Sequence, residues 1–252
     1  SLIFNLKNPH KIPLKILSKI FFWYKRSVYK TEVFISDQNK KFEKINFNRN
    51  NAKKKLDSLK QKYDFLNREM SSEHELLFAS ISIYSKIKIN NILEIGAGSG
   101  RLTECILTLK KNINYTICDI PPSIYIAYER MKVAFPNKKI GNLIDHNNPI
   151  ELNKKILEND INFIFPHQLR FIEDNFFSIV IAVDCLHEMD KKTLEIYFNF
   201  INKITENFYF SIWKKTKNWH SKTLFKKTER LDFDKNDYNI PRNWKNVFKE
   251  DL

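Results

Sequence analysis

Glycine is scarce in this chain and is concentrated at one place. An average glycine content of ~7% would give roughly 18 glycines in a chain of this size, whereas the 252-residue sequence has 4. Three of them, Gly96, Gly98 and Gly100, lie within five residues. Glycine permits a tight turn and lets a ligand approach the backbone closely. The cluster therefore predicts either a ligand-binding loop or a tight connection and nothing more.

The glycine cluster lies between a predicted strand and a predicted helix, and the same alternation continues along the chain. Short apolar runs predict strands at Asn91–Ile95, Asn114–Cys118, Ile161–Phe165, Ser178–Val183 and Asn207–Trp213. Amphipathic patterns predict helices at Ser99–Leu109, Pro122–Val133, Glu151–Glu158 and Lys191–Ile204. This alternation is typical of an α/β fold with a mostly parallel central sheet and helices on both faces. Ligands of such sheets bind beyond the carboxyl ends of the strands, where the glycine cluster lies.

Positive charge is concentrated in the first part of the chain. The sequence has 43 Lys and Arg against 29 Asp and Glu, which gives a net charge of +14. Residues 1–70 alone hold 17 basic and 6 acidic residues, so they account for most of this excess. We predict a basic, helical N-terminal extension over residues 1–72 and an α/β domain over residues 73–252, whose first helix Ser72 caps.

The segment Leu14–Tyr29 is predicted to form a helix that carries both basic and large apolar residues. Such a helix docks on the protein's own core or on a second copy in a homo-oligomer, or it lies in the headgroup layer of a membrane. We expect no signal peptide, and the sequence has no run of ~18–20 apolar residues that could span a bilayer. Its three cysteines form no C-x-x-C pair, and we expect them to be small buried thiols. We therefore expect a cytoplasmic protein, with any membrane contact at the inner face.

The glycines have the spacing G-x-G-x-G within the segment Leu93–Leu102. A dinucleotide fingerprint would have its third glycine at Arg101, and a P-loop would end in Gly-Lys-Ser/Thr. The segment instead resembles the Rossmann-like S-adenosylmethionine (SAM)-dependent methyltransferases, in which an acidic and an apolar residue precede G-x-G-x-G. The resemblance covers roughly residues 73–213. It implies a Rossmann-like methyltransferase fold with SAM as cofactor and S-adenosylhomocysteine (SAH) as product.

The resemblance also implies which residues bind the cofactor. Those in the first loop are Glu94, Gly96, Ala97, Gly98 and Gly100. Asp119 ends the second predicted strand, where the family has an acidic residue that accepts hydrogen bonds from both ribose hydroxyls, and Ile120 follows it. A carboxylate suits that task because it has two acceptor oxygens. Capping the following helix is the alternative role of Asp119. His167 and Gln168, after the third strand, are candidates for contacts to adenine.

The segment Asp174–Met189 resembles the fourth strand of the family and its following loop, where acceptor and methyl group meet. Asp184 is there a further candidate for cofactor binding. A hydroxyl acceptor is a poor nucleophile while protonated, and a positioned base contributes typically about 10²–10⁴-fold. We predict His187 as this base, with Asp184 or Glu188 orienting it or replacing it. Packing is the alternative role of His187. Asp184 and Glu188 could contribute to an Mg²⁺ site, but the sequence shows no complete ligand set, so no metal is predicted.

A narrower resemblance concerns the acceptor. The segments Cys118–Tyr125, His187–Met189 and Tyr238–Trp244 resemble the sugar O-methyltransferases of bacterial surface-polysaccharide gene clusters. This implies an acceptor hydroxyl on a nucleotide-activated sugar or on a glycan of a capsule or lipopolysaccharide. The family usually completes its sheet with an antiparallel hairpin, whereas only 39 residues follow Trp213 here and their strand character is weak.

Two alternatives to a sugar O-methyltransferase come from other function classes. The net charge favours a nucleic-acid methyltransferase acting on RNA. Base N-methylation usually uses [DN]-P-P-[YF] after the fourth strand, where this chain has Asp184-Cys185-Leu186-His187, and the basic excess lies outside the predicted catalytic domain. The other alternative is a cofactor-binding scaffold without catalysis. We therefore predict a SAM-dependent O-methyltransferase that acts on a sugar.

Overall fold

The computed structural model describes residues 29–36, 88–110, 112–143, 148–213, 220–223, 226–229, 238 and 240–251, together with positions 54, 57 and 61. The strands are β1 (Tyr29–Ser36), β2 (Asn91–Ile95), β3 (Asn114–Cys118), β4 (Ile161–Ile164), β5 (Ile179–Val183), β6 (Asn207–Trp213), β7 (His220–Thr223), β8 (Lys226–Glu229) and β9 (Trp244–Asp251). The α-helices are α5 (Arg101–Leu109), α6 (Ser123–Ala134), α7 (Pro149–Glu158) and α8 (Lys191–Ile204). Two short 3₁₀ helices are η3 (Pro166–Phe171) and η4 (Leu186–Glu188).

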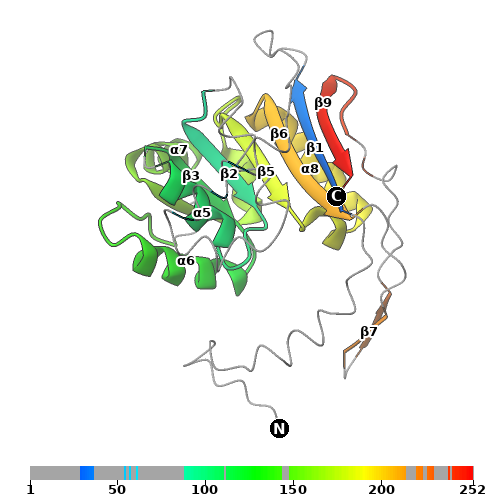
Figure 1. Ribbon diagram of the computed structural model, residues 1–252, viewed down its shortest axis with the longest axis horizontal. Helices are drawn as coiled ribbons and strands as arrows, with labels where there is room; N and C mark the ends of the chain where they lie inside the picture. The colour runs from blue at the N-terminus through cyan, green and yellow to red at the C-terminus, as the bar shows by residue number, and fades with distance from the viewer. Residues whose placement is uncertain are drawn as a thin grey trace.

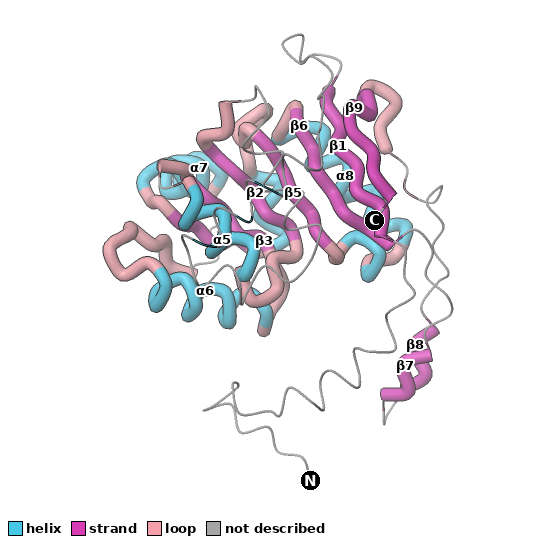
Figure 2. The backbone as a smooth tube through the Cα atoms, in the orientation of Figure 1, coloured by secondary structure: helices cyan, strands magenta, loops and turns pink. Residues whose placement is uncertain are grey.

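A seven-stranded sheet forms the centre of the molecule, with the strand order β4-β3-β2-β5-β6-β1-β9 (Figure 1). The five strands from β4 to β6 are parallel, and β1 is antiparallel to both of its neighbours. Strands β7 and β8 form a separate two-stranded antiparallel sheet (Figure 2). The parallel order matches the predicted α/β fold with a Rossmann-like sheet.

Helices cover the two faces of this sheet and enclose two apolar cores (Figure 1). On one face, Ile106 of α5 and Met131 of α6 pack with Ile92 of β2. On the other face, α7 and α8 pack over the neighbouring residue Leu93 and over Val180 of β5. Successive residues of a buried parallel strand therefore serve opposite cores, which explains the continuous apolar runs in the sequence.

The predicted strands and helices between Asn91 and Trp213 are confirmed, with small differences at their ends that local hydrogen bonds explain. The helix predicted after Ser72 lies outside the described residues. Helix α5 begins at Arg101 and not at Ser99, because the backbone N–H of Gly100 donates to the carbonyl of Ala97 at 2.9 Å and extends the turn. Helix α7 begins at Pro149, because the side chain of Asn148 accepts hydrogen bonds from the first turn. The three cysteines are buried thiols, as predicted.

Residues 29–36 carry no strand in the sequence-based prediction, yet they form β1 in the interior of the sheet. In the pairing register Glu32 lies opposite Phe210 of β6 on one side and Lys249 of β9 on the other. The antiparallel strand expected from a C-terminal hairpin thus comes from the N-terminal part of the chain, and β9 becomes the edge. Part of the predicted extension is in this way integrated into the sheet, and Tyr29 lies in β1 instead of ending a helix.

The remaining predictions for the N-terminal part fall outside the described residues. They include residues 14–28 of the predicted basic helix with its membrane contact, and the domain boundary at residues 72 and 73. Among the helices of the described ranges, none has the length and apolar composition needed to cross a bilayer.

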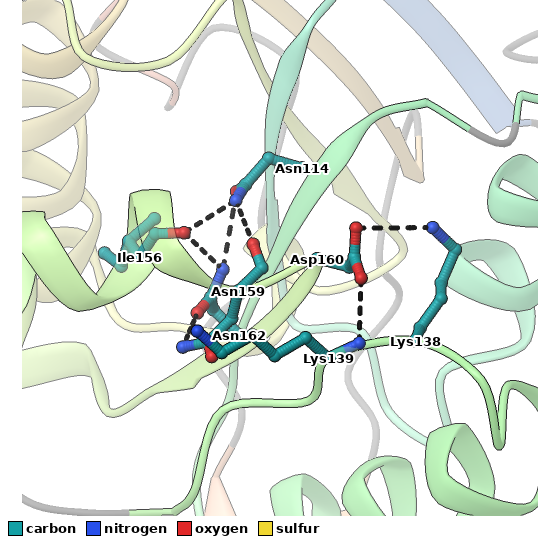
Figure 3. Close-up of polar contacts among 7 residues, drawn as sticks. All are labelled: Asn114, Lys138, Lys139, Ile156, Asn159, Asp160 and Asn162. Carbon is teal, nitrogen blue, oxygen red and sulfur yellow. Dashed lines mark hydrogen bonds and ion pairs between the residues drawn. The ribbon is translucent and has the colours of Figure 1, made fainter.

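Asparagine side chains fix the amino ends of β3 and β4, opposite the glycine cluster (Figure 3). The amide nitrogen of Asn114 donates to the carbonyls of Ile156 and Asn159 at 2.6 and 2.5 Å. The amide nitrogen of Asn162 donates to the same carbonyl of Ile156 at 3.0 Å. The last carbonyls of a helix have no partner within it, so these amides satisfy the end of α7 and join it to the sheet.

The interior position of β1 can be tested with proline. Replacing Glu32 by proline removes an N–H from a strand that is paired on both sides. We expect Glu32→Pro to lower the free energy of unfolding by about 1–3 kcal/mol, the cost of a buried polar group left without its partner. Glu32→Ala keeps the backbone N–H and should therefore lower it by less than Glu32→Pro does. Chemical denaturation measures both variants, and equal stabilities would contradict the pairing of β1.

Candidate active site

The glycine loop joins β2 to α5 in a conformation that requires glycine. Gly96, Gly98 and Gly100 have φ angles of 71°, 58° and 75°, in the left-handed region. A side chain at Gly96 would also collide with the neighbouring strand end, because its Cβ would lie 2.3 Å from the Cβ of Cys185. Around Gly98 no atom lies within 4 Å of where a Cβ would be, so this residue borders open space.

Glu94, at the end of β2, stabilises the start of the glycine loop through buried hydrogen bonds. Its side chain is buried, and one carboxylate oxygen accepts hydrogen bonds from the hydroxyls of Thr103 at 2.6 Å and Tyr115 at 2.8 Å. Burial, followed by the charge of Glu94, raises the pKa of Tyr115 well above its ordinary value, so its hydroxyl keeps the proton that it donates. The acidic residue of the motif therefore ties β2 to α5 and β3.

Asp119 connects the loop after β3 to the glycine loop. Its Oδ2 accepts a hydrogen bond from the backbone N–H of Gly98 at 2.7 Å, and its Oδ1 accepts one from Ile120 at 2.7 Å. Burial raises the pKa of this carboxyl, while the two N–H groups oppose the increase. The N-cap residue of α6 is Pro122, without a side-chain cap, so Asp119 does not have the alternative role of capping that helix.

A cavity of about 560 Å³ opens over the carboxyl ends of β2, β3 and β5. This volume lies within the range of about 300–1,000 Å³ typical of small-molecule sites. Most of the predicted site residues line it, and these are Glu94, Gly96, Ala97, Gly98, Asp119, Ile120, Asp184 and Glu188. Three segments that are far apart in the sequence thus meet at one edge of the sheet, as expected for strands that run parallel.

Four predicted site residues do not line the cavity. Gly100 instead packs near Met131, whose Cε would lie 3.2 Å from an added Cβ. Gln168 is buried, and its side-chain oxygen accepts a hydrogen bond from the backbone of Phe165 at 2.8 Å, which fixes the start of η3. His167 is exposed, and its ring stacks on that of Phe165 with centroids 6.0 Å apart. Neither contact leads to the cavity, which Pro166 lines in their place.

His187 is the fourth of these residues. It lies in η4, its side chain is only 5% exposed, and it is not among the residues that line the cavity. The short 3₁₀ turn directs the next residue, Glu188, to the cavity, and Glu188 is exposed. This placement favours packing over a catalytic role for His187, and of the three residues predicted for a base only Asp184 and Glu188 line the cavity.

The loop after β5 has an unusual backbone at Asp184, with a φ of 54° in a residue that is not glycine. The next residue, Cys185, is buried and its thiol donates to the carbonyl of Ile95 at 3.1 Å. This contact holds the end of β5 against the end of β2. Asp184 is thereby fixed at the cavity wall in a conformation that costs free energy and is often found at functional sites.

Sequence reasoning did not identify the contribution of α8. Thr193 and Tyr197, one helical turn apart, line the cavity from this helix. Burial and the nearby Cys118, Cys185 and Asp119 raise the pKa of Tyr197 well above its ordinary range. The spacing of four residues was visible in the sequence, but nothing there distinguishes a residue that faces a cavity from one that faces the core.

No group of three or more His, Cys, Asp or Glu side chains in the described part of the chain is arranged to hold a metal ion. Asp184 and Glu188 therefore do not belong to a group of three or more metal-ligating side chains in the described part of the chain.

No family model matches the sequence, and no curated protein is similar to it. Among solved structures, a candidate O-methyltransferase of Nostoc punctiforme is 14% identical over 56% of this chain and 35% of its own, with a TM-score of 0.37. A candidate sarcosine dimethylglycine methyltransferase of Galdieria sulphuraria is 17% identical over 55% of this chain and 44% of its own, with a TM-score of 0.39. The methyltransferase domain of bacterial CtHen1 is 14% identical over 66% of this chain and 79% of that domain, with a TM-score of 0.40. The chain spans less than half the length of the first two.

The first two glycines of the loop, Gly96 and Gly98, are expected to differ in the cost of the same substitution. Gly96→Ala combines a left-handed backbone with a collision against Cys185, so we expect a loss of about 2–5 kcal/mol of stability. Gly98→Ala meets no atom and should lose only the backbone cost of about 1–2 kcal/mol. Thermal and chemical unfolding measure both variants. Equal losses would contradict the close approach of the loop to β5.

Proposed function

We propose that this protein is a SAM-dependent O-methyltransferase that acts on a hydroxyl group of a sugar. The observation that carries the proposal is the link between the Gly98 N–H and Asp119 at the mouth of an open cavity. It joins a glycine loop that a ligand can approach closely to a carboxylate suited to a ribose diol. The open space around Gly98 supports the fit of an adenosyl compound at this place.

In this proposal the residues of the loops hold the cofactor by its polar groups. Asp119 accepts hydrogen bonds from the ribose hydroxyls with the lone pairs that Gly98 and Ile120 leave available. Ile120 and the glycine loop provide apolar and backbone surface beside it. SAM supplies an activated methyl group on a sulfonium, whose departure as a neutral thioether drives the reaction.

Glu188 is the proposed general base. It is exposed, lines the cavity and follows β5, where an acceptor would enter. Glu188 accepts the hydroxyl proton while the acceptor oxygen forms its bond to the methyl carbon and the carbon–sulfur electron pair stays on sulfur. Asp184, at the same wall, positions the acceptor hydroxyl for an in-line approach. His187 has no part in this step because it lies outside the cavity.

The sugar acceptor is the most specific part of the proposal. It is proposed from the resemblance of three short segments to the sugar O-methyltransferases of polysaccharide gene clusters. The full chain should be incubated with labelled SAM and three pools, namely nucleotide-activated sugars, capsular or lipopolysaccharide glycans, and total RNA. Label in a sugar pool is expected. Label found only in RNA would replace the proposal by the nucleic-acid alternative that the net charge of +14 favours.

Cofactor binding should depend on the charge of Asp119. We expect Asp119→Asn to weaken SAM binding by about 1.5–3 kcal/mol, the scale of hydrogen bonds to charged groups. Isothermal titration calorimetry measures the change. Asp174→Asn is a matched control, because Asp174 is exposed and is not among the cavity-lining residues.

The SAM affinity measured by calorimetry should also depend on pH. Burial raises the pKa of Asp119 above the ordinary value of 3.8, and ribose binding requires the ionised form. SAM affinity should therefore fall as the pH falls through this raised pKa, at a higher pH than an ordinary aspartate would require. Asp119→Asn should remove this dependence, because the amide does not titrate. Unchanged affinity in the variant would remove Asp119 from the site.

Turnover should depend on Glu188. We expect Glu188→Gln to lower kcat by about 10²–10⁴-fold, because the hydroxyl loses its base. Glu195→Gln is the matched control, since Glu195 is an exposed residue of α8 that does not line the cavity. His187→Phe tests the packing role and should retain kcat if it folds. Full turnover by Glu188→Gln together with a large loss in the folded His187 variant would return the base role to His187.

A further inference from the structure

The charges that line the cavity have one predominant sign. Among the lining residues that the structure describes, four carry carboxylates, and the list is Glu94, Asp119, Asp184 and Glu188. Arg101, at the first position of α5, is the one positively charged member of the same described set. The described walls of the cavity therefore carry an excess of three negative charges.

These carboxylates act on a common region. Burial raises the pKa of the Cys185 thiol well above its ordinary value, and the charges of all four carboxylates raise it further. Cys185 lies beneath the glycine loop, where its thiol contacts the carbonyl of Ile95. All four carboxylates are therefore near Cys185, a residue that also lines the cavity.

The other titratable groups at the cavity do not offset this charge. Burial raises the pKa of Cys118 and of Tyr197 well above the neutral range, so both side chains stay uncharged. They add no negative charge, and neither can become positive. Within the described part, the balance is therefore set by the carboxylates and Arg101.

The four carboxylates differ in their hydrogen bonds and in their position in the cavity. Glu94 accepts hydrogen bonds from Thr103 and Tyr115, and Asp119 accepts two from the backbone. These two belong to the cofactor end of the cavity. Asp184 and Glu188 follow β5 and lie at the end where the acceptor is proposed to enter.

We propose that the cavity selects its occupants by charge, so that it prefers SAM to SAH and takes a sugar acceptor that carries no phosphate. This inference rests on the proposed function and narrows its acceptor to a hydroxyl of an uncharged sugar residue. A sulfonium is attracted by carboxylates in a partly desolvated cavity, where Coulomb interactions are stronger than in water. A phosphate there would face like charges that the single positive charge of Arg101 only partly offsets.

The same charges assist the release of the product. Transfer of the methyl group removes one positive charge from the cofactor, while the hydroxyl proton neutralises Glu188. The attraction that holds SAM is thereby lost for SAH, and the two products leave a cavity that returns to its negative state when Glu188 releases its proton.

Calorimetry with SAM and SAH tests the selection without relying on turnover. The variant is Met189→Lys, which adds a positive charge at a lining position, and Met189→Gln is its uncharged control. We expect Met189→Lys to weaken SAM binding by about threefold to tenfold and SAH binding by less than about twofold. Met189→Gln should change both affinities by less than about twofold. Equal weakening of SAM and SAH by Met189→Lys would overturn the inference.

The wild-type chain provides a measurement that does not depend on the folding of a variant. Added salt screens charges, so it should weaken SAM binding more than SAH binding. Equal salt dependence of the two affinities would contradict selection by charge. If SAM does not bind the wild-type chain at all, the proposed function itself fails, and this outcome is distinct from binding without charge selection.

Labelled transfer tests the acceptor. Matched pools of phosphate-free oligosaccharides and of nucleotide-activated sugars are offered separately with labelled SAM. Label in the phosphate-free pool, at a rate at least about tenfold higher, supports the inference. Equal or faster transfer to nucleotide-activated sugars overturns the charge selection but leaves the proposed methyltransferase activity intact.

Discussion

The close approach of three strand ends is the constraint on which the rest of the site depends. The N–H of Gly96 donates to the carbonyl of Cys118, and the thiol of Cys185 donates to the carbonyl of Ile95. These contacts leave no room for a side chain at Gly96. They hold the ends of β3 and β5 against the end of β2, so that Asp119 and Asp184 come to opposite sides of one cavity.

Two carboxylates at this edge, one buried and one partly buried, make different contacts. Glu94 satisfies two hydroxyl donors in the core and stabilises the base of the glycine loop. Asp119 joins two loops through the Gly98 N–H and remains at the cavity wall. Such an arrangement places negative charge at the cavity wall on side chains that are already held by hydrogen bonds, so a ligand bound there would restrict little further side-chain motion.

The sheet is completed by pairing between distant parts of the chain. Strand β1 comes from residues 29–36 and lies between β6 and β9, which belong to the C-terminal half. Paired on both sides, β1 has no exposed ladder, and β9 becomes the edge strand. A part of the chain that appears from its composition to be an appended basic segment is thereby required for the central sheet.

The sequence by itself determined the α/β fold, the glycine loop and the position of Asp119, because each depends on local periodicity or on backbone freedom that a few adjacent residues fix. It left open whether His187 or Glu188 enters the cavity, since a single 3₁₀ turn decides which of two neighbours faces inward. The contribution of Tyr197 and the pairing of β1 were also decided only by the tertiary structure. Both depend on contacts between segments far apart in the sequence, and neither residue type nor spacing specifies which distant strand or cavity a segment will meet.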